Sequence, residues 1–298
     1  MKKILFLIIA ASVLLLQGCG NAEFDKKNAY DLLKKQVEIG PRYPGSPGHD
    51  KIIDFIYSYM DKKADKVKKD KYQEMMENDY VDFCNIIAYF NTNAPRYILL
   101  AAHYDSRPTA DNEVTAEKKA KPIPGANDGA SGVAVLMELA RVFAAKKPNV
   151  GVIMVFFDCE DYPMKMFGGS THFAENIEAI SAIGGKNIVI DYGILLDMVG
   201  DKNLNIYKEK NSVKFADDIV TKIWNEAAAL GYSKYFIPEE KYTIIDDHLP
   251  LNGYGTKCVD IIDFDYAHWH TLDDTVDKCS PESLKIVGDV VASVIYKE

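Results

Sequence analysis

Four apolar segments of this 298-residue sequence are each followed by acidic or histidine residues, and this feature constrains the fold more than any other. The segments cover residues 97–102, 152–157, 194–196 and 258–262, and the polar residues that follow them include His103, Asp105, Glu160, Asp161, Asp197 and His270. Near-continuous apolar runs are typical of strands that are covered on both faces. Because the C-terminal ends of parallel strands open onto one crevice, the sequence predicts that these side chains meet at one edge of an open sheet.

Helical segments alternate with the predicted strands. The expected helices cover residues 28–38, 50–62, 130–145, 212–229 and 281–296, and the expected strands cover residues 82–91, 96–102, 150–157, 188–197, 204–207 and 257–263. We expect Asn28 to cap the first helix, and we interpret the lysine-rich segment 61–71 as a solvated helix end. With 48% hydrophobic residues, no repeat and no long linker, the sequence predicts a single α/β domain with a mostly parallel central sheet flanked by helices.

The N-terminal residues have the pattern of an export signal. Lys2 and Lys3 precede an apolar run over residues 4–16, which is short for a membrane span. The four residues Leu16-Gln17-Gly18-Cys19 resemble a bacterial lipobox, in which the cysteine is lipidated. We therefore predict a signal peptide over residues 1–18, a lipidated Cys19 with a polar tether over 19–27, and a globular domain over 28–298. The protein would be an exported bacterial lipoprotein, membrane-anchored in the periplasm or at the cell surface. The alternatives to a lipoprotein signal are an ordinary signal peptide with a chance cysteine and an uncleaved anchor.

Charge and cysteine spacing exclude two classes of function. The net charge is -9 and no basic stripe is visible, so nucleic acid is not an expected partner. The cysteines after residue 19 are widely spaced and form no CxxC pair, which excludes a zinc finger. They are Cys84, Cys159, Cys258 and Cys279. We expect buried free thiols, although a disulfide is possible in an exported protein.

Asp128 completes a set of residues that is suited to metal binding. It lies in the glycine-flanked turn 124–129, just before a predicted helix. With the histidines and acids at the strand ends, it gives a ligand set typical of zinc and leaves a carboxylate free for acid–base chemistry. Adjacent residues past a strand end can diverge. Of Glu160 and Asp161, one can therefore bind the metal while the other acts on substrate.

Each of these residues also has a purely structural interpretation. Asp128 can be a turn or N-cap residue, and His103 with Asp105 can be a hydrogen-bonded structural pair. The acids at 160–161 can belong to a solvated loop. Their common place at one sheet edge favours the functional interpretation.

The order of these motifs resembles a known family. His103-x-Asp105 is followed by Gly-Ala-Asn-Asp-Gly-Ala-Ser-Gly at 125–132, then by Glu-Asp, by Leu-Leu-Asp and finally by His-Thr. This order is similar to the zinc aminopeptidases of the M28 peptidase group, which also contains the glutaminyl cyclases. Segments 41–48, 103–106, 245–250 and 269–271 together resemble the glutaminyl-peptide cyclotransferases. The resemblance runs from about residue 28 to the C-terminus.

The resemblance implies a zinc aminopeptidase-like catalytic domain with a mixed, mostly parallel sheet and one zinc ion per chain. The implied metal ligands are Asp128, Asp161 and His270, and the implied general acid/base is Glu160. Asp197 and Asp246 would form the hydrogen-bond network that holds Glu160. The implied pocket residues are Trp269, Ile245 and Phe167. The implied reaction converts an N-terminal glutamine of peptides or proteins to pyroglutamate and releases ammonia. The loop 162–167 lacks the tryptophan that these cyclases usually carry, so Phe167 or Tyr162 is expected in its place.

Two other functions are compatible with the same residues. In a dizinc aminopeptidase, His103 and Asp197 would complete a second metal site and Glu160 would activate water. In a non-catalytic lipoprotein, the same scaffold would only bind peptides. The segment 246–248 together with Trp269 favours the cyclase.

Overall fold

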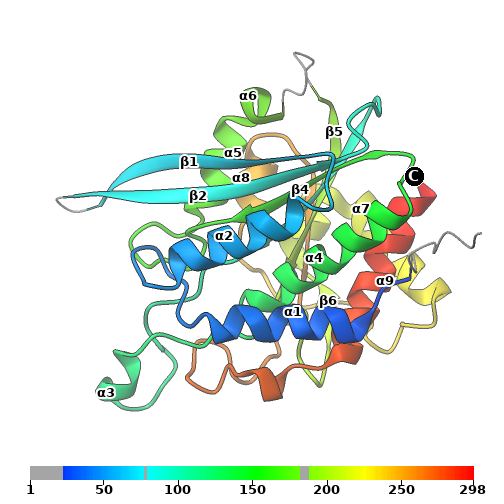
Figure 1. Ribbon diagram of the computed structural model, residues 1–298. Helices are drawn as coiled ribbons and strands as arrows, with labels where there is room; N and C mark the ends of the chain where they lie inside the picture. The colour runs from blue at the N-terminus through cyan, green and yellow to red at the C-terminus, as the bar shows by residue number, and fades with distance from the viewer. Residues whose placement is uncertain (1–22, 77–78, 182–187) are drawn as a thin grey trace, which may run out of the picture.

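The computed structural model describes residues 23–76, 79–181 and 188–298, and a six-stranded sheet forms its centre (Figure 1). The strand order is β1-β2-β4-β3-β5-β8, with bounds Lys66–Met76, Asp79–Phe90, Gly151–Phe157, Tyr97–His103, Ile190–Asp197 and Cys258–Ile262. Strands β4, β3, β5 and β8 are parallel, whereas β2 is antiparallel to both β1 and β4. A short parallel pair, β6 (Ile206–Lys208) and β7 (Phe236–Glu240), forms a second sheet. The predicted fold class, a mixed and mostly parallel sheet flanked by helices, is confirmed.

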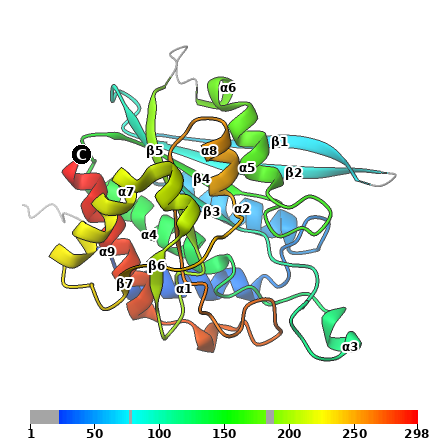
Figure 2. The ribbon, with the colours of Figure 1, turned by 180° about the vertical axis from the view of Figure 1, so that it is seen from behind.

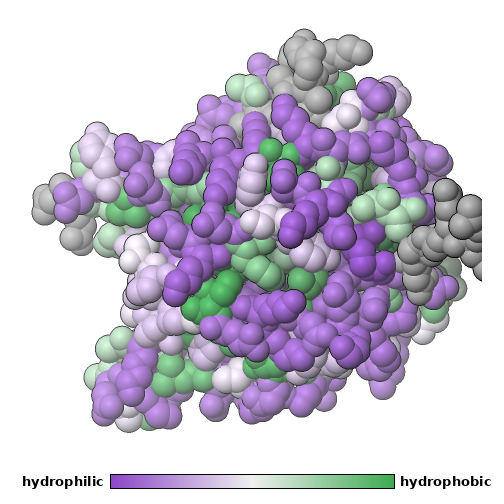
Figure 3. Space-filling model, in the orientation of Figure 1, coloured by the Kyte–Doolittle hydropathy of each residue, from purple (hydrophilic) through white to green (hydrophobic). Residues whose placement is uncertain are grey.

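Helices cover both faces of this sheet (Figures 1 and 2). One face carries α1 (Lys26–Glu38), α2 (His49–Met60), α4 (Ala130–Ala145) and α9 (Pro281–Lys297), and the other carries α5 (Gly168–Glu175) and α8 (His248–Gly253). Helix α7 (Lys210–Ala229) packs against β8 and α9. The short helices α3 (Ala116–Lys119), α6 (Ile177–Ser181) and the 3-10 turn Val276–Lys278 lie in connections. The outer surface over α1 and α2 is mostly hydrophilic (Figure 3).

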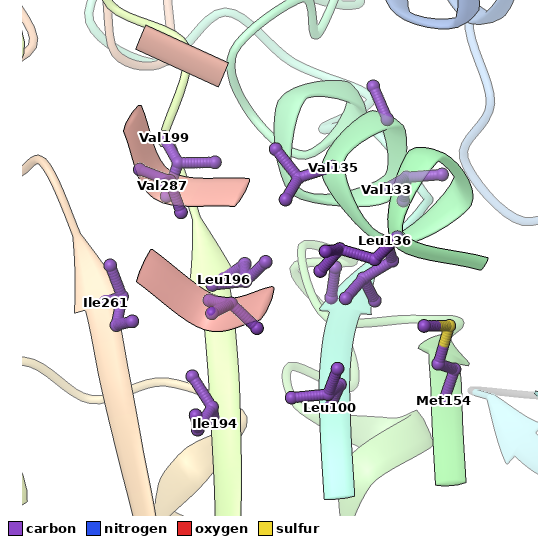
Figure 4. Packing of buried hydrophobic residues seen from close by; sticks show 14 of the residues in the cluster. Leu100, Val133, Val135, Leu136, Met154, Ile194, Leu196, Val199, Ile261 and Val287 are labelled. Atoms are coloured by element: carbon purple, nitrogen blue, oxygen red, sulfur yellow. The ribbon is translucent and has the colours of Figure 1, made fainter. Parts of the chain in front are cut away.

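Helix α4 is the centre of the larger hydrophobic core. Its side chain Leu136 points toward Leu100 of β3 (Figure 4), and Val133 and Met154 belong to the same buried cluster. The sequence predicted one apolar face, but the opposite side of α4 is buried as well, because α1 and α9 pack on it. A helix that is apolar all round is stable only between two layers. This packing fixes the N-terminus of α4, and with it Asp128, relative to the strand ends.

The lysine-rich segment was predicted wrongly. Residues 66–76 form strand β1 and pair with β2 along their full length, from Lys66 opposite Tyr89 to Met76 opposite Asp79. As the outermost strand of the sheet, β1 is only half-buried. Lysines on such an edge discourage pairing with other chains, which explains the composition.

The start of α1 also differs from the prediction. Asp25, not Asn28, is the N-cap, and its side chain accepts hydrogen bonds from the backbone N–H groups of Lys27 and Asn28. The Asn28 amide instead donates to Glu138 on α4. Phe24 is buried against the site of Gly288, so ordered packing begins within the segment predicted as a tether. The predicted signal peptide and Cys19 lie outside the described residues.

Two further observations concern cysteines and membranes. None of the four cysteines in the described ranges forms a disulfide, and all four are buried, as predicted. Across residues 23–76, 79–181 and 188–298, no helix has both the length and the apolar character needed to cross a bilayer.

Candidate metal centre

The structure brings together Asp128, Asp161 and His270 at the C-terminal edge of the sheet. One ligand atom from each lies within 4.8 Å of the others, and all three residues are buried. His270 Nε2 is 3.6 Å from Asp128 Oδ2 and 3.5 Å from Asp161 Oδ1. His270 has a left-handed backbone (φ 55°), an uncommon conformation for a non-glycine residue that is found at functional sites.

This arrangement fits a zinc ion. Carboxylate oxygens and imidazole nitrogens are both zinc ligands, and catalytic zinc sites have three protein ligands and keep a fourth position open. Asp161 Oδ2 is buried and has no hydrogen-bond partner among the described residues. A buried polar atom without a partner is costly, and a metal ion would remove that cost.

His103 lies beside this set and belongs to a second candidate cluster. Its Nε2 atom is 3.2 Å from both Asp128 Oδ1 and Asp197 Oδ1. Its Nδ1 atom is 3.5 Å from Asp105 and 3.7 Å from Glu160. Burial lowers the pKa of His103, but the surrounding carboxylates outweigh it and raise the pKa well above its ordinary value. In its protonated form His103 donates hydrogen bonds to these carboxylates, and in its neutral form the same distances allow it to be a ligand of a second cation.

Glu160 is the carboxylate that remains free of the three-residue set. It lines the site pocket and is largely buried. Burial, together with the nearby charges of Asp161 and Asp246, raises the pKa of Glu160 well above its usual range, against the influence of His103. The pKa of Asp197 is raised to about 7, again mainly by burial. Carboxyl groups with raised pKa values are suited to proton transfer near neutral pH.

A small pocket of about 60 Å³ opens onto these groups. Its apolar wall is formed by Met166, Met198, Ile244, Ile245, Ile262, Phe264 and Trp269. The ring of Trp269 stacks on His270 with a centroid distance of 4.0 Å and contacts Phe264 at 5.0 Å. Trp269 and Ile245 therefore line the pocket, and Asp246 does so from the polar side.

The prediction for Phe167 needs correction. Met166, rather than Phe167 or Tyr162, is the residue of loop 162–167 that lines the pocket. Phe167 has a left-handed backbone (φ 60°) at the start of α5, and its N–H donates to the Glu160 carbonyl. Tyr162 packs edge-on against Phe83. Met166 is 43% exposed, so a flexible thioether side chain lines the pocket where an aromatic ring was expected.

The sequence matches the family profile described as "Peptidase family M28" over residues 85–295. The chain belongs to this family. Among solved structures, it is similar to the Bacteroides thetaiotaomicron glutaminyl cyclase bound to N-acetylhistamine, with 35% identity, a TM-score of 0.86, and coverage of 93% of this chain and 99% of that chain. A Zn-dependent exopeptidase from Parabacteroides distasonis has 34% identity and a TM-score of 0.86, with coverage of 93% and 99%. A curated relative is the glutaminyl-peptide cyclotransferase of Boiga irregularis, 25% identical over 84% of this chain and 75% of that protein. The resemblance to the glutaminyl cyclases of the M28 group is thus confirmed.

Two acids hold the backbone of the segments that carry Asp128 and Asp161. Asp105 accepts hydrogen bonds from the backbone N–H groups of Glu160 and Asp161, each at 3.1 Å. The sequence predicted Asp105 as a partner of His103, and its hold on residues 160–161 was missed. Asp274, which was missed altogether, accepts from the backbone N–H of Asn127 at 2.8 Å and of Asp128 at 3.2 Å. Both carboxylates therefore fix main chain, in addition to the side chains that they contact, His103 for Asp105 and Tyr266 for Asp274.

Arg42 and Gly129 also position the turn that carries Asp128. The fully buried Arg42 guanidinium donates to the carbonyls of Tyr104, Pro124 and Gly125 at 2.7–3.2 Å. A lone arginine in the Pro/Gly-rich segment 40–48 was the available sequence signal. At Gly129, a Cβ atom would lie 2.3 Å from His103 Nε2, so only glycine permits this close approach.

A group of buried acids lies behind Asp246. His248, Asp260 and Asp246 offer ligand atoms within 4.8 Å of one another, and His248 Nε2 is 3.3 Å from Glu209 Oε2. Burial and the charge of Asp246 raise the pKa of Asp260 well above its usual range. Burial also tends to raise the pKa of Glu209, but hydrogen bonds from His248 and three backbone N–H groups lower it to about 2. Neither Asp260 nor Glu209 was identified from the sequence.

Proposed function

We propose that the chain is a zinc-dependent glutaminyl-peptide cyclotransferase, which converts the N-terminal glutamine of peptides to pyroglutamate with one zinc per chain. The observation that carries this proposal is the free carboxyl group of Glu160 beside the Asp128, Asp161 and His270 set, in a pocket walled by Trp269. The cyclases among the relatives support it.

The reaction is an intramolecular aminolysis. The α-amine attacks the side-chain carbonyl carbon, a C–N bond closes the five-membered lactam, and the bond to the side-chain nitrogen breaks to release ammonia. Zinc held by Asp128, Asp161 and His270 would polarise the carbonyl and stabilise the oxyanion. Glu160 takes a proton from the attacking amine and delivers it to the departing nitrogen.

The other residues position substrate and base. Trp269 and Phe264 enclose the folded glutamine side chain and exclude water, which would compete as a nucleophile. The proposed link from Asp197 to Glu160 runs through His103, which is 3.2 Å from Asp197 and 3.7 Å from Glu160. Asp246 contributes through its charge, which raises the pKa of Glu160.

A dizinc aminopeptidase is the second candidate, favoured by the cluster of His103, Asp128 and Asp197. In that enzyme Glu160 would activate a water molecule. The similarity to a Zn-dependent exopeptidase is consistent with it.

One pair of assays distinguishes the candidates. We expect the purified mature domain to bind about one zinc ion, as catalytic sites with three protein ligands do. It should release ammonia from Gln-initiated peptides and leave Leu-initiated peptides and leucine amide intact. Two tightly bound zinc ions with release of free amino acids would establish the aminopeptidase. Bound zinc without turnover of either substrate would indicate a peptide-binding protein.

Glu160→Gln separates the base from the ligands. The variant should lose about 10²- to 10⁴-fold in turnover while it retains zinc. Glu175→Gln, on an exposed glutamate of α5, is the matched control and should leave both properties unchanged. If Glu160→Gln loses the metal and Asp161→Asn keeps it, the roles of these adjacent carboxylates are reversed.

We also propose that Cys19 is lipidated and anchors the protein to a membrane. The lipobox-like residues 16–19 support this proposal. Cys19→Ala should release the protein from the membrane fraction or block its maturation. Unchanged membrane association of a cleaved Cys19→Ala protein would contradict lipidation.

A further inference from the structure

Arg107 connects a long surface loop to the proposed metal site. It follows β3 at the start of the segment 107–124, and its side chain is only 11% exposed. Its Nη1 group donates to Asp161 Oδ1, and its Nε group donates to Asp111 Oδ2. The guanidinium therefore joins a buried carboxylate of the ligand set to a carboxylate near the surface.

Asp161 is constrained from several sides by these contacts. Asp105 Oδ2 accepts from its backbone N–H at 3.1 Å, and Arg107 binds its Oδ1 atom. Its Oδ2 atom is buried without a hydrogen-bond partner in the described part of the chain. With the main chain and one oxygen fixed, rotation of the carboxylate plane is restricted.

We infer that Arg107 is a positioning residue for the metal site, which fixes the orientation of the Asp161 carboxylate within the ligand set. This inference rests on the proposed zinc site at Asp128, Asp161 and His270. Groups that orient metal ligands contribute strongly to metal affinity. Their loss typically lowers the metal affinity about 10- to 100-fold.

Positioning of Asp161 requires the planar guanidinium group of Arg107, with its donors in fixed directions, and not only its positive charge. Arg107 donates from two different nitrogens in two directions, to Asp161 and to Asp111. A lysine has one compact ammonium group, which preserves the charge but not this fixed geometry. The negative charge of Asp111 offsets part of the positive charge of Arg107. Arg107 therefore changes the net charge around the ligand set only slightly.

The test compares Arg107→Gln and Arg107→Lys with a matched control, Arg96→Gln. Arg96 also pairs with two carboxylates, Asp191 and Glu298, but it precedes β3 at the opposite end of the strand. The zinc dissociation constant is measured by chelator competition. The visible spectrum of the Co²⁺-loaded protein reports the ligand geometry.

Both Arg107 variants should bind zinc about 10- to 100-fold more weakly and should shift the Co²⁺ spectrum, while Arg96→Gln matches the native protein in both. Asp111→Asn weakens the contact of the Arg107 Nε group but leaves Arg107 in place. It should therefore weaken zinc binding and shift the Co²⁺ spectrum in the same direction, but by less. It provides the test if an Arg107 variant does not fold.

Two results would overturn the inference while leaving the proposed function intact. In the first, all Arg107 and Asp111 variants bind zinc and show the Co²⁺ spectrum of the native protein. In the second, Arg107→Lys is native-like and only Arg107→Gln is impaired, which would mean that charge suffices. A native protein that binds no zinc would overturn both the inference and the proposed function.

Discussion

Asp274→Asn tests whether the turn that carries Asp128, a proposed metal ligand, is held by a buried carboxylate. Asp274 Oδ1 accepts from the Asn127 N–H and the Tyr266 hydroxyl, and Oδ2 accepts from the Asp128 N–H. Asparagine can keep the contacts of one oxygen, but its NH₂ group then faces the Asp128 N–H. One buried donor loses its acceptor, and the remaining bonds lose their charge, which together cost about 3 kcal/mol of unfolding free energy.

The loss also affects metal binding, because the orphaned N–H belongs to a proposed ligand residue. We expect zinc affinity to fall about 10- to 100-fold. Chelator competition measures the affinity, and urea unfolding of the metal-free protein measures the stability. Asp273→Asn changes the exposed neighbouring aspartate and should alter neither quantity. The reasoning is refuted by an Asp274→Asn protein whose zinc affinity equals that of the native protein and whose stability differs by less than about 0.5 kcal/mol.

Three further outcomes are expected. The pKa of Glu209 is lowered from 4.5 to about 2, so its ionised form stabilises the fold by about 3 kcal/mol above pH 4.5, and this contribution is lost as the pH falls toward 2. In urea unfolding at pH 7, Glu209→Gln should therefore be less stable than the native protein by about 3 kcal/mol, and at pH 3 the loss of stability should be smaller. An equal loss at both pH values would contradict this prediction. Gly129→Ala should cost more than about 2 kcal/mol in thermal unfolding, because the new Cβ meets His103 at 2.3 Å, whereas Gly253→Ala adds a Cβ in open space and should be neutral. Excess zinc at about 100 times its dissociation constant should stabilise the native protein by about 2.7 kcal/mol and leave His270→Ala unaffected; equal stabilisation of both would exclude His270 as a ligand.

The sheet and the meeting of strand-end residues at one of its edges were accessible from sequence because buried parallel strands leave a continuous apolar signal that ends abruptly in polar residues. The choice of Asp128, Asp161 and His270 as one set came from the family resemblance. Strand β1 leaves no such signal. Its lysines are set by its position at the sheet edge, and its conformation comes from pairing with β2. Local composition alone therefore suggested a helix end.

The missed site residues share a different property. Asp274 bonds to a backbone group 147 residues away, and Arg42 bonds to carbonyls 62–83 residues away. Contacts between a side chain and distant main chain follow no periodic pattern, so no window of sequence reveals them. The choice of Met166 over Phe167 likewise depends on a left-handed turn, which the residue types of the loop do not specify.

One short connection after β8 carries both His270 and Asp274, so it supplies one proposed ligand and also holds the turn that presents Asp128. Local opening of this connection would withdraw His270 and release the support of Asp128 in the same event. Metal dissociation and amide hydrogen exchange at Asn127 and Asp128 should then occur at the same rate. Such coupling would make the site an all-or-none unit, in which partial loss of coordination is rare and a chelator acts by capturing an opened form.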